Sequence, residues 1–452
     1  MGMLSNYDRN LKVTGLGISP WPRLGPQKWF KDYRICAASD WDISPKVAGL
    51  ELVVPNFSIA PKKTETLINQ PSSKQLFTKG ELKHYRILPY KPFELPDWLP
   101  AERVLANSHE LYARLENKAL FREEFSDITP FPEFVIYDKD KMPGVANYQD
   151  LRGQFGVFVL QDDVLSGGQG TYIVSNQEEY KKARKELLLS RGSRVVASKF
   201  IDGSLEGSLQ SAVTRFGIAV GPLQQQFVRE PLLCSIGDQV GDKFCGAQIS
   251  ANAPQHLQMS MYETAQAIGK RLQKLGYKGI FGLDLLFDPN NGEFFVIELN
   301  ARTTGVTPLH SMFDSNPIHT PFYPLHILEL AGADYKMDNS NFGGPGKFTH
   351  DCSLLVLHVR DGESHSLNKS PRSGLYGWDG SRLSFESLRV GFRDDLSSKE
   401  VVLQVYQPAH ANLKPGARLA FVFTKWLVKD KRGNFSPEAM RLIEEIYKQF
   451  NL

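Results

Sequence analysis

The feature that most constrains how this chain folds is an apolar, β-prone stretch from Gly279 to Gly305 that turn residues divide into two halves. The turn residues are Pro289-Asn290-Asn291-Gly292, and turn chemistry between two such halves predicts an antiparallel hairpin. With Asn290-Asn291-Gly292 as a three-residue loop and Gly292 in the left-handed region, Asp284 lies directly opposite Glu298. A four-residue loop would instead place Asp284 among the core residues, so the register decides what the hairpin can do.

In the first register the two faces of the hairpin differ in chemistry, because side chains alternate along a strand. The predicted core face carries large apolar residues only: Leu283, Leu285, Phe287, Phe295, Ile297 and Leu299. The opposite face carries four polar residues and two apolar ones: Asp284, Glu298, Asn300, Arg302, Phe294 and Val296. Two carboxylates and an amide oxygen are hard ligands that suit Mg²⁺, and an arginine fork can hold a phosphate or carboxylate oxygen. A merely solvated outer face is the alternative, and its two apolar residues argue against it.

Composition narrows the classes of partner. The 53 Lys and Arg and 50 Asp and Glu give a formal net charge of +3 over 452 residues, which is far from the basic footprint of a dedicated nucleic-acid binder. The apolar runs are shorter than the ~18–20 residues that a membrane-spanning helix needs, and the N-terminus lacks the apolar core of a signal peptide. We therefore expect no nucleic-acid partner and no membrane partner.

The four cysteines, Cys36, Cys234, Cys245 and Cys352, form no CxxC pair and are too few for a disulfide framework in a chain of this length. Cys234 and Cys245 could meet across a hairpin, although buried free thiols are the simpler interpretation. A reducing, cytoplasmic setting is the resulting expectation.

Changes of pattern along the chain predict an α/β protein with three domains. Residues 1–106 contain a strand followed by a turn and end in a proline-rich segment near Pro100, which indicates a small α/β domain. Residues 107–340 alternate strands and helices and include the hairpin. Residues 341–452 are rich in strands and close with a helix, so a β-rich third domain is expected.

Two helices of the middle region are predicted from local signals. Apolar residues recur at helical spacing from Asn107 through Phe125 and predict helix there. Ser175 with Glu178 predicts a capping box at the start of a basic helix from Gln177 to Ser190.

The order of the motifs resembles the ATP-grasp superfamily. The hairpin ends in Glu298-Leu299-Asn300-Ala301-Arg302, with an upstream acid at Asp284, which is similar to the family's Glu-x-Asn pattern followed by Arg. Asn117-Lys118 opens a helix, as in the family. Ser166-Gly167-Gly168-Gln169-Gly170 resembles the flexible loop that closes over the triphosphate, and Ser198 to Gly203 resemble the hinge that holds the adenine edge.

The resemblance implies an ATP-grasp body whose two parts, residues 107–200 and 201–340, clamp the nucleotide, with residues 1–106 as the domain that usually precedes it. It implies ATP as the cofactor, with Mg²⁺, or alternatively Mn²⁺, on Asp284, Glu298 and Asn300. It assigns catalysis to Arg302, Glu298 and Asn300. It assigns nucleotide binding to residues of the helix, the loop, the hinge and the strand after the hinge: Lys118, Gln161, Ser166, Gly167, Gly168, Gly170, Lys199, Phe200, Ile201 and Glu206.

The implied activity is ATP-dependent ligation of a carboxylate to an amine through an acyl phosphate. Its partners are a small-molecule acid and amine, such as amino acids or peptides, with a homodimer as a candidate assembly. Two alternatives stay open: a carboxylating or carbamoylating enzyme with the same body, and a non-catalytic nucleotide-binding module with a degenerate site.

The alternative of a non-catalytic module rests on Gln161, which occupies the position where the family usually has a phosphate-binding lysine. Glutamine supplies no charge, so Lys118 and Lys199 are the candidates for that role. His310, His319 and His326 follow the hairpin, but their spacing suits no short metal-ligand motif, and they are interpreted as ordinary loop or core histidines.

Overall fold

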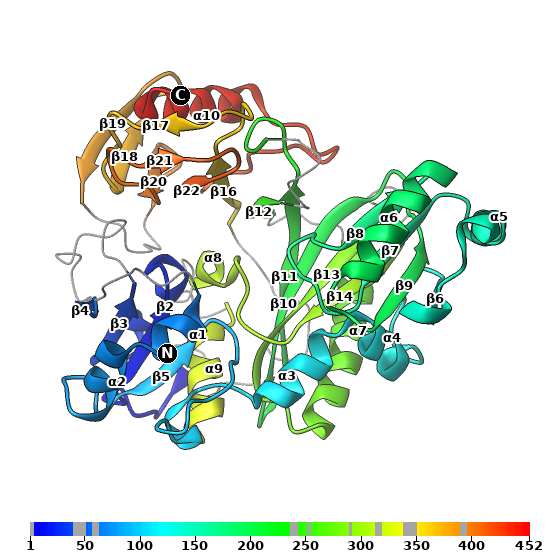
Figure 1. The fold of residues 1–452 in the computed structure, drawn as a ribbon. Helices are drawn as coiled ribbons and strands as arrows, with labels where there is room; N and C mark the ends of the chain where they lie inside the picture. Colours follow the sequence, from blue (N-terminus) through cyan, green and yellow to red (C-terminus); the bar gives the residue numbers. More distant parts are fainter. Residues whose placement is uncertain are drawn as a thin grey trace.

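The computed structural model describes residues 4–38, 51–56, 63–235, 243–250, 255–288, 292–311, 319–337, 350–388 and 396–452. Helices and strands gather into three parts, with the N-terminal part at lower left, a body from the middle of the chain at right and the C-terminal part at the top (Figure 1). The predicted α/β class is confirmed. Within the described ranges, no helix is long and apolar enough to cross a membrane.

The N-terminal part is a parallel four-stranded sheet in the order β4-β3-β2-β5. Its elements are β2 Val13–Gly17, β3 Tyr33–Ala37, β4 Glu51–Val53, α1 Thr64–Ile68, α2 Pro71–Thr78 and β5 Arg86–Pro89. Every residue of the central strand β2 is buried, as expected where a parallel sheet is covered on both faces. The small α/β unit expected from the sequence is therefore present.

A second four-stranded sheet, in the order β6-β9-β7-β8, is antiparallel throughout. Its elements are β6 Phe134–Asp138, α5 Tyr148–Phe155, β7 Phe158–Asp162, β8 Thr171–Val174, α6 Gln177–Leu189 and β9 Arg194–Lys199. Apolar side chains of the sheet and of both helices share one core, in which Tyr180 and Leu187 of α6 pack with Phe158 of β7. This core makes the sheet a compact unit that carries the Gly-rich loop between β7 and β8.

The cap of α6 differs from the prediction by one residue. Asn176, not Ser175, is the N-cap, and its side-chain oxygen accepts a hydrogen bond from the Glu179 N–H at 3.0 Å. The Glu179 carboxylate in turn accepts hydrogen bonds from the backbone N–H and the hydroxyl of Ser175. The predicted pairing of Ser175 with Glu178 is therefore wrong. Asparagine caps a helix as well as serine does, so the two neighbouring residues were both able to be the cap.

The largest sheet has ten strands in the order β14-β13-β10-β11-β12-β16-β22-β20-β18-β19. Its strands are β10 Leu205–Thr214, β11 Gly217–Val228, β12 Phe244–Ile249, β13 Gly279–Phe287, β14 Phe294–Asn300, β16 Cys352–His358, β18 Gly374–Trp378, β19 Leu383–Ser387, β20 Glu400–Val405 and β22 Arg418–Thr424. Because β12 pairs with β16, one ladder runs from the body into the C-terminal part. The domain boundaries at 106/107, 200/201 and 340/341 stay predictions.

Two long amphipathic helices cover this sheet. In the body, α7 (Gln255–Lys274) packs on β10 and β11 with residues such as Met261 and Ile268, and in the C-terminal part α10 (Pro437–Phe450) adds Leu442 and Ile446 to a second core. Both helices present apolar residues at helical spacing toward the strands, which is why they form there.

Shorter elements complete the fold. The strand β1 (Leu4–Ser5) pairs with β15 (Lys336–Met337), β17 (His365–Ser366) pairs with β21 (Asn412–Leu413), and α8 (Thr307–Ser311) and α9 (Phe322–Ala331) follow the hairpin. One-turn 3-10 segments lie at Trp21–Arg23, Pro26–Lys28, Ala101–Arg103, Lys139–Lys141 and Val145–Asn147.

The helical pattern from Asn107 through Phe125 corresponds to two helices, α3 (His109–Glu116) and α4 (Lys118–Phe125), and the second opens at Asn117-Lys118 as the resemblance implied. Asn117 separates them, because its side-chain oxygen accepts hydrogen bonds from the N–H groups of Ala119 and Leu120, each at 3.0 Å. An N-cap residue has extended backbone, so a continuous helix cannot pass through it. The break makes Lys118 the first residue of α4.

The hairpin of β13 and β14 has the predicted register where it matters most, since Asp284 pairs with Glu298. Gly292 has the predicted left-handed backbone, with φ 77°, while Pro289 to Asn291 lie outside the described residues.

A β-bulge at Ile297 shifts the register on the turn side of this pair, so that Leu285 pairs with Val296. One extra residue in a strand reverses the alternation of its side chains. Val296 is therefore fully buried, whereas Phe295 and Ile297, which were predicted for the core face, are only partly buried. The predicted faces of β14 are therefore wrong between Phe295 and Ile297 and correct from Glu298 onward, while Leu285 and Phe287 of β13 are buried as predicted.

We predict that Asn117→Ala lowers the free energy of unfolding by about 1–2 kcal/mol, because it removes the cap of α4. It also removes the hydrogen bond from the Asn117 amide to the Asp163 carboxylate at 3.0 Å. Asn176→Ala is the matched control at the exposed cap of α6 and should cost about 1 kcal/mol. Urea unfolding followed by circular dichroism measures both losses, and a variant at Asn117 as stable as the wild type would contradict the capping assignment.

Candidate active site

The centre of the candidate site is the carboxylate pair of Asp284 and Glu298, which face each other across the hairpin. Each Asp284 oxygen accepts one hydrogen bond: Oδ1 from the Gln226 amide and Oδ2 from the Asn300 amide, both at 2.9 Å. Gln226 comes from β11 and reaches over β10 to the hairpin. Three strands therefore hold one carboxylate in a single orientation.

Burial, together with the charge of Glu298, raises the pKa of Asp284 from its ordinary value near 4 to about 6. Like charges directly opposite on neighbouring strands are destabilising, so this pair costs folding free energy at neutral pH. A cation between the two carboxylates would offset that cost.

Arg302 follows β14, and every nitrogen of its guanidinium is engaged. Its Nε lies 2.9 Å from a Glu116 carboxylate oxygen, and Nη2 donates to Asn300 Oδ1 at 2.7 Å. Its Nη1 donates to the Tyr90 hydroxyl and to the Thr303 carbonyl, each at 3.2 Å. Arg302 thus joins the end of the hairpin to α3 and to the segment after β5.

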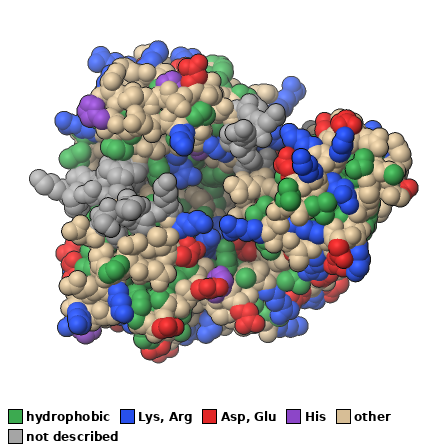
Figure 2. Space-filling view, viewed as in Figure 1, with side chains coloured by type: hydrophobic (Ala, Val, Ile, Leu, Met, Phe, Trp, Pro, Cys, Tyr) green, Lys and Arg blue, Asp and Glu red, His purple; other side chains and the backbone are tan. Residues whose placement is uncertain are grey.

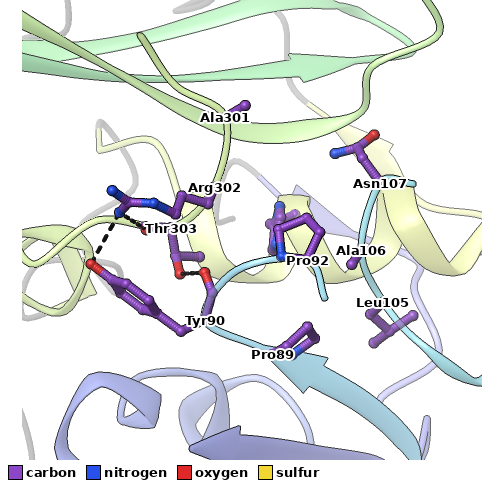
Figure 3. A pocket seen from close by; sticks show the side chains of 10 residues that line it. Pro89, Tyr90, Pro92, Leu105, Ala106, Asn107, Ala301, Arg302 and Thr303 are labelled. Atoms are coloured by element: carbon purple, nitrogen blue, oxygen red, sulfur yellow. Dashed lines mark hydrogen bonds between the residues drawn. The ribbon is translucent and has the colours of Figure 1, made fainter. Parts of the chain in front are cut away.

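These contacts line a small cavity between the hairpin and the N-terminal part (Figure 3). Figure 3 shows the Arg302 guanidinium directed at the Tyr90 hydroxyl, while the Thr303 hydroxyl donates to the Tyr90 carbonyl at 2.9 Å. The remaining lining residues are Pro89, Pro92, Leu105, Ala106, Asn107, Ala301 and His326.

Lys118 connects the carboxylate pair to the Gly-rich loop. Its side chain is 4% exposed, its Nζ donates to the Leu165 carbonyl, and the same atom lies 3.7 Å from Glu298 Oε1. The loop is exposed at Ser166 and Gly167, and its residues Gly167, Gly168 and Gly170 have φ of 67°, 74° and 71°. Glycine adopts this left-handed backbone without steric cost, so the loop can bring backbone N–H groups close to a ligand.

The acids that follow Gln161 hold the loop rather than a ligand. The buried Asp162 carboxylate accepts from the N–H groups of Val164 and Leu165 and forms an ion pair with Lys139 at 3.0 Å. Asp163 binds Asn117.

Arg122 is a site residue that the sequence interpretation missed. It is 1% exposed, and its Nη2 lies 3.3 Å from Gln161 Oε1 and 3.4 Å from the Ile297 carbonyl at the bulge. Within the described residues, the Arg122 guanidinium donates hydrogen bonds to carbonyl and amide oxygens, and its Nε has no hydrogen-bond partner. Burial lowers the pKa of this guanidinium to about 10. A buried cation beside Gln161 brings positive charge to a position that glutamine leaves neutral.

The predicted hinge residues lie apart from the carboxylate pair. Lys199 is exposed at the end of β9, where its N–H donates to the Glu133 carbonyl, and the Phe200 N–H donates to the Val157 carbonyl. Ile201 follows in the connection to β10. Glu206 is exposed on β10 and shares a sheet face with Ser208, which pairs with Asp284. The structure therefore brings Asp284, Glu298, Asn300, Arg302 and Lys118 together, while the hinge residues border a second sheet.

The histidines after the hairpin are not free ligands. Burial lowers the pKa of His310 and His326 to about 3, with His310 hydrogen-bonded to Gln224 and His326 accepting from the Ile280 N–H. The four cysteines are free and buried.

Comparison with known proteins identifies this region. A family model described as an ATP-grasp domain matches residues 116–306. Residues 116–306 are an ATP-grasp domain. The match contains the carboxylate pair, Lys118, Arg122, Gln161 and the Gly-rich loop.

The chain is 27% identical over 199 residues to the formate-dependent phosphoribosylglycinamide formyltransferase of Methanocella arvoryzae, a match that covers 43% of each protein. The chain therefore matches less than half the length of this curated relative.

Two solved structures share the fold over nearly the whole chain. One is the biotin carboxylase domain of the 2-oxoglutarate carboxylase of Hydrogenobacter thermophilus, with 13% identity, a TM-score of 0.60, and 94% of this chain and 87% of that chain covered. The other is phosphoribosylamine–glycine ligase from Thermotoga maritima, with 16% identity, a TM-score of 0.58, and 97% and 96% covered.

ATP and Mg²⁺ are the typical ligands of ATP-grasp proteins, and the biotin carboxylase domain was crystallised with MgADP. The residue types of this chain fit Mg²⁺, because the carboxylates of Asp284 and Glu298 face each other across the hairpin and Asn300, which brings a further hard oxygen, contacts Asp284 through its amide. Burial and the charge of Glu298 raise the pKa of Asp284, and a cation between the two carboxylates would offset both effects. The described part of the chain holds no group of three or more His, Cys, Asp or Glu placed for a metal.

We predict that the carboxylate pair makes stability depend on pH. The pKa of Asp284 is raised in the folded chain, so the folded state binds the proton more tightly and stability falls as pH rises from about 4 to about 6. Asp284→Asn removes this dependence, so its gain over the wild type should grow with pH toward a ceiling of about 3 kcal/mol.

Urea unfolding of both proteins at a series of pH values measures the gain, and added Mg²⁺ should reduce it at neutral pH. Glu293→Gln, on the same hairpin, is exposed and serves as the control for removal of one charge. A gain that is equal at acidic and neutral pH would contradict the raised pKa of Asp284.

Proposed function

We propose that this protein is an ATP-dependent ligase that joins a carboxylate to an amine in an amide or peptide bond, through an acyl phosphate, with release of ADP and phosphate. The observation that carries the proposal is the convergence of Asp284, Glu298, Asn300, Lys118 and Arg302 within an ATP-grasp domain. Nothing structural requires two partly buried carboxylates and two largely buried cations at one point, and their electrostatic cost is explained if they bind charged ligands.

The chemistry is phosphoryl transfer followed by acyl transfer. A carboxylate oxygen of the acid attacks the γ-phosphorus of ATP, the bond to the β,γ-bridging oxygen breaks, and ADP leaves. The amine nitrogen then attacks the acyl carbon, phosphate leaves, and the amine gives up a proton. Catalysis is mostly positioning and neutralisation of charge, so no nucleophilic side chain is needed.

Mg²⁺ bound to Asp284, Glu298 and Asn300 would neutralise the charge that develops on the phosphates. Lys118 lies between Glu298 and the Gly-rich loop, where its ammonium can hold a phosphate oxygen and bring the loop down. Closing the loop excludes water and protects the acyl phosphate from hydrolysis. Arg302, held by Glu116 and Asn300, is oriented to bind the acid and to stabilise the tetrahedral intermediate.

Arg122 brings to this position the positive charge that Gln161 lacks. We assign to Arg122 the positive charge at this end of the nucleotide site, transmitted to the phosphates through Gln161, whose amide is then oriented to donate. This favours a competent site over a degenerate one.

Ser166, Gly167, Gly168 and Gly170 are proposed to bind the phosphates, and Lys199, Phe200, Ile201 and Glu206 the nucleoside. The amine–acid ligation is supported by the name of phosphoribosylamine–glycine ligase, which shares the fold. The carboxylase relative keeps carboxylation as the second candidate, and dependence of ADP release on bicarbonate distinguishes it. A cytoplasmic setting and a homodimer stay predictions.

The first test is Glu298→Gln. We expect ADP release to be abolished, while the free energy of unfolding at neutral pH is unchanged or higher, because the repulsion with Asp284 is relieved. Calorimetric titration with a slowly hydrolysed ATP analogue should show binding that weakens without Mg²⁺ and in the Asp284→Ala/Glu298→Ala protein. Glu293→Gln should behave as the wild type, and wild-type turnover in Glu298→Gln would overturn the catalytic assignment.

The second test addresses Arg122. Loss of a charge-assisted hydrogen-bonding group predicts that Arg122→Gln binds the ATP analogue about tenfold more weakly or worse. Arg122→Lys should recover part of the affinity, because it keeps the charge and loses the fork. Arg114→Gln, on the neighbouring helix, removes an exposed arginine and is the control. Unaltered affinity in a folded Arg122→Gln protein, judged by its melting curve, would refute the role.

A further inference from the structure

Two buried guanidinium groups lie outside the machinery described so far. Arg23, from the N-terminal part, is 6% exposed, and its Nε donates to the Leu16 carbonyl at 2.8 Å. Arg418 is the first residue of β22 in the C-terminal part, and its Nε is buried with no hydrogen-bond partner. Within the described ranges, neither side chain is in an ion pair with a carboxylate.

Both arginines surround the same pair of tyrosines, next to Arg302. The Arg23 guanidinium lies 5.2 Å from the centre of the Tyr90 ring, and the Arg302 guanidinium lies 5.3 Å from the same centre. Arg418 lies 5.3 Å from the centre of the Tyr406 ring. Tyr90 and Tyr406 are electrostatic neighbours of both Arg23 and Arg418. Three arginines from three parts of the chain therefore meet at one place, and among the described residues only Arg302 of the three has an acidic partner.

The molecule is hollowed at the junction of these parts. In Figure 2 a hollow lies between the C-terminal part at the top and the two lower parts, and lysine and arginine side chains stand around it. Burial lowers the pKa of Arg23 and of Arg418, which expresses the cost of keeping two charged groups away from water. Bound anions offset such a cost, and the arginine fork matches a carboxylate or a phosphate in two parallel hydrogen bonds.

We propose that the acid substrate carries a second anionic group, a carboxylate or a phosphate, which Arg23 and Arg418 hold beside Tyr90 while Arg302 faces the reacting carboxylate. This assignment rests on the proposed ligase function and narrows it to acids with two anionic groups. Since the two arginines come from the N-terminal and C-terminal parts, binding of such an acid would also draw these parts together over the ATP-grasp domain.

The test is calorimetric titration of the whole protein, with its nucleotide site filled by the ATP analogue and Mg²⁺. The probes are matched pairs that differ by one anionic group: succinate against butyrate, and 3-phosphoglycerate against glycerate. We expect one dianion to bind the wild type about tenfold more tightly than its monoanionic partner, or better. The pair that shows the preference tells a carboxylate from a phosphate.

In Arg23→Gln and in Arg418→Gln the preference for the dianion should disappear, while the affinity for the ATP analogue stays unchanged. The control is Arg360→Gln, which removes an arginine that pairs with Glu444 in the C-terminal part. The wild-type comparison needs no variant, so it decides even if Arg23→Gln does not fold. No preference in the wild type, or an intact preference in both folded variants, would overturn the proposal. If the analogue itself does not bind, the ligase function fails, and the same titrations without nucleotide still decide whether the arginines hold the second anion.

Discussion

The interaction on which the rest of the structure depends is the repulsion between Asp284 and Glu298, which are held face to face across an antiparallel pair of strands. Left alone, two such carboxylates destabilise a sheet. Here Gln226 and Asn300 hold Asp284 by hydrogen bonds, and Lys118 stands near Glu298. These partners reduce the repulsion without removing it, and burial together with the remaining repulsion raises the pKa of Asp284.

The same principle extends to the cations. Arg122, Arg23 and Arg418 are buried groups that form no ion pair with a carboxylate in the part of the chain that the structure describes, although burying an unpaired charge costs folding free energy. In an ATP-grasp domain the missing charges have a natural source, because the triphosphate, the divalent cation and an acid substrate bring both signs. The folded chain thus contains charged groups that charged ligands would neutralise. Binding of such ligands should therefore raise the free energy of unfolding more than binding to an uncharged pocket would.

The secondary structure around the site was partly predictable. The hairpin and its register followed from alternation and turn chemistry, which act between neighbouring residues. The bulge at Ile297 did not, because its freed backbone groups are satisfied from outside the hairpin: Val296 donates to the Pro130 carbonyl and Ile297 accepts from Arg122. The start of a helix at Asn117-Lys118 followed from the resemblance, but the contact of Asn117 with Asp163, far along the chain, did not.

The sequence by itself determined the chemistry of the hairpin, the opposition of Asp284 and Glu298 and the resemblance to the ATP-grasp superfamily. These depend on residue types and on short spacings, which a linear pattern records. Only the tertiary structure decided that Arg122 lies against Gln161, that Gln226 holds Asp284 and that Arg23, Arg302 and Arg418 share the tyrosines Tyr90 and Tyr406. Such contacts join segments from separate sheets and helices, and no local periodicity encodes which buried charge will meet which partner once the chain has closed its long loops.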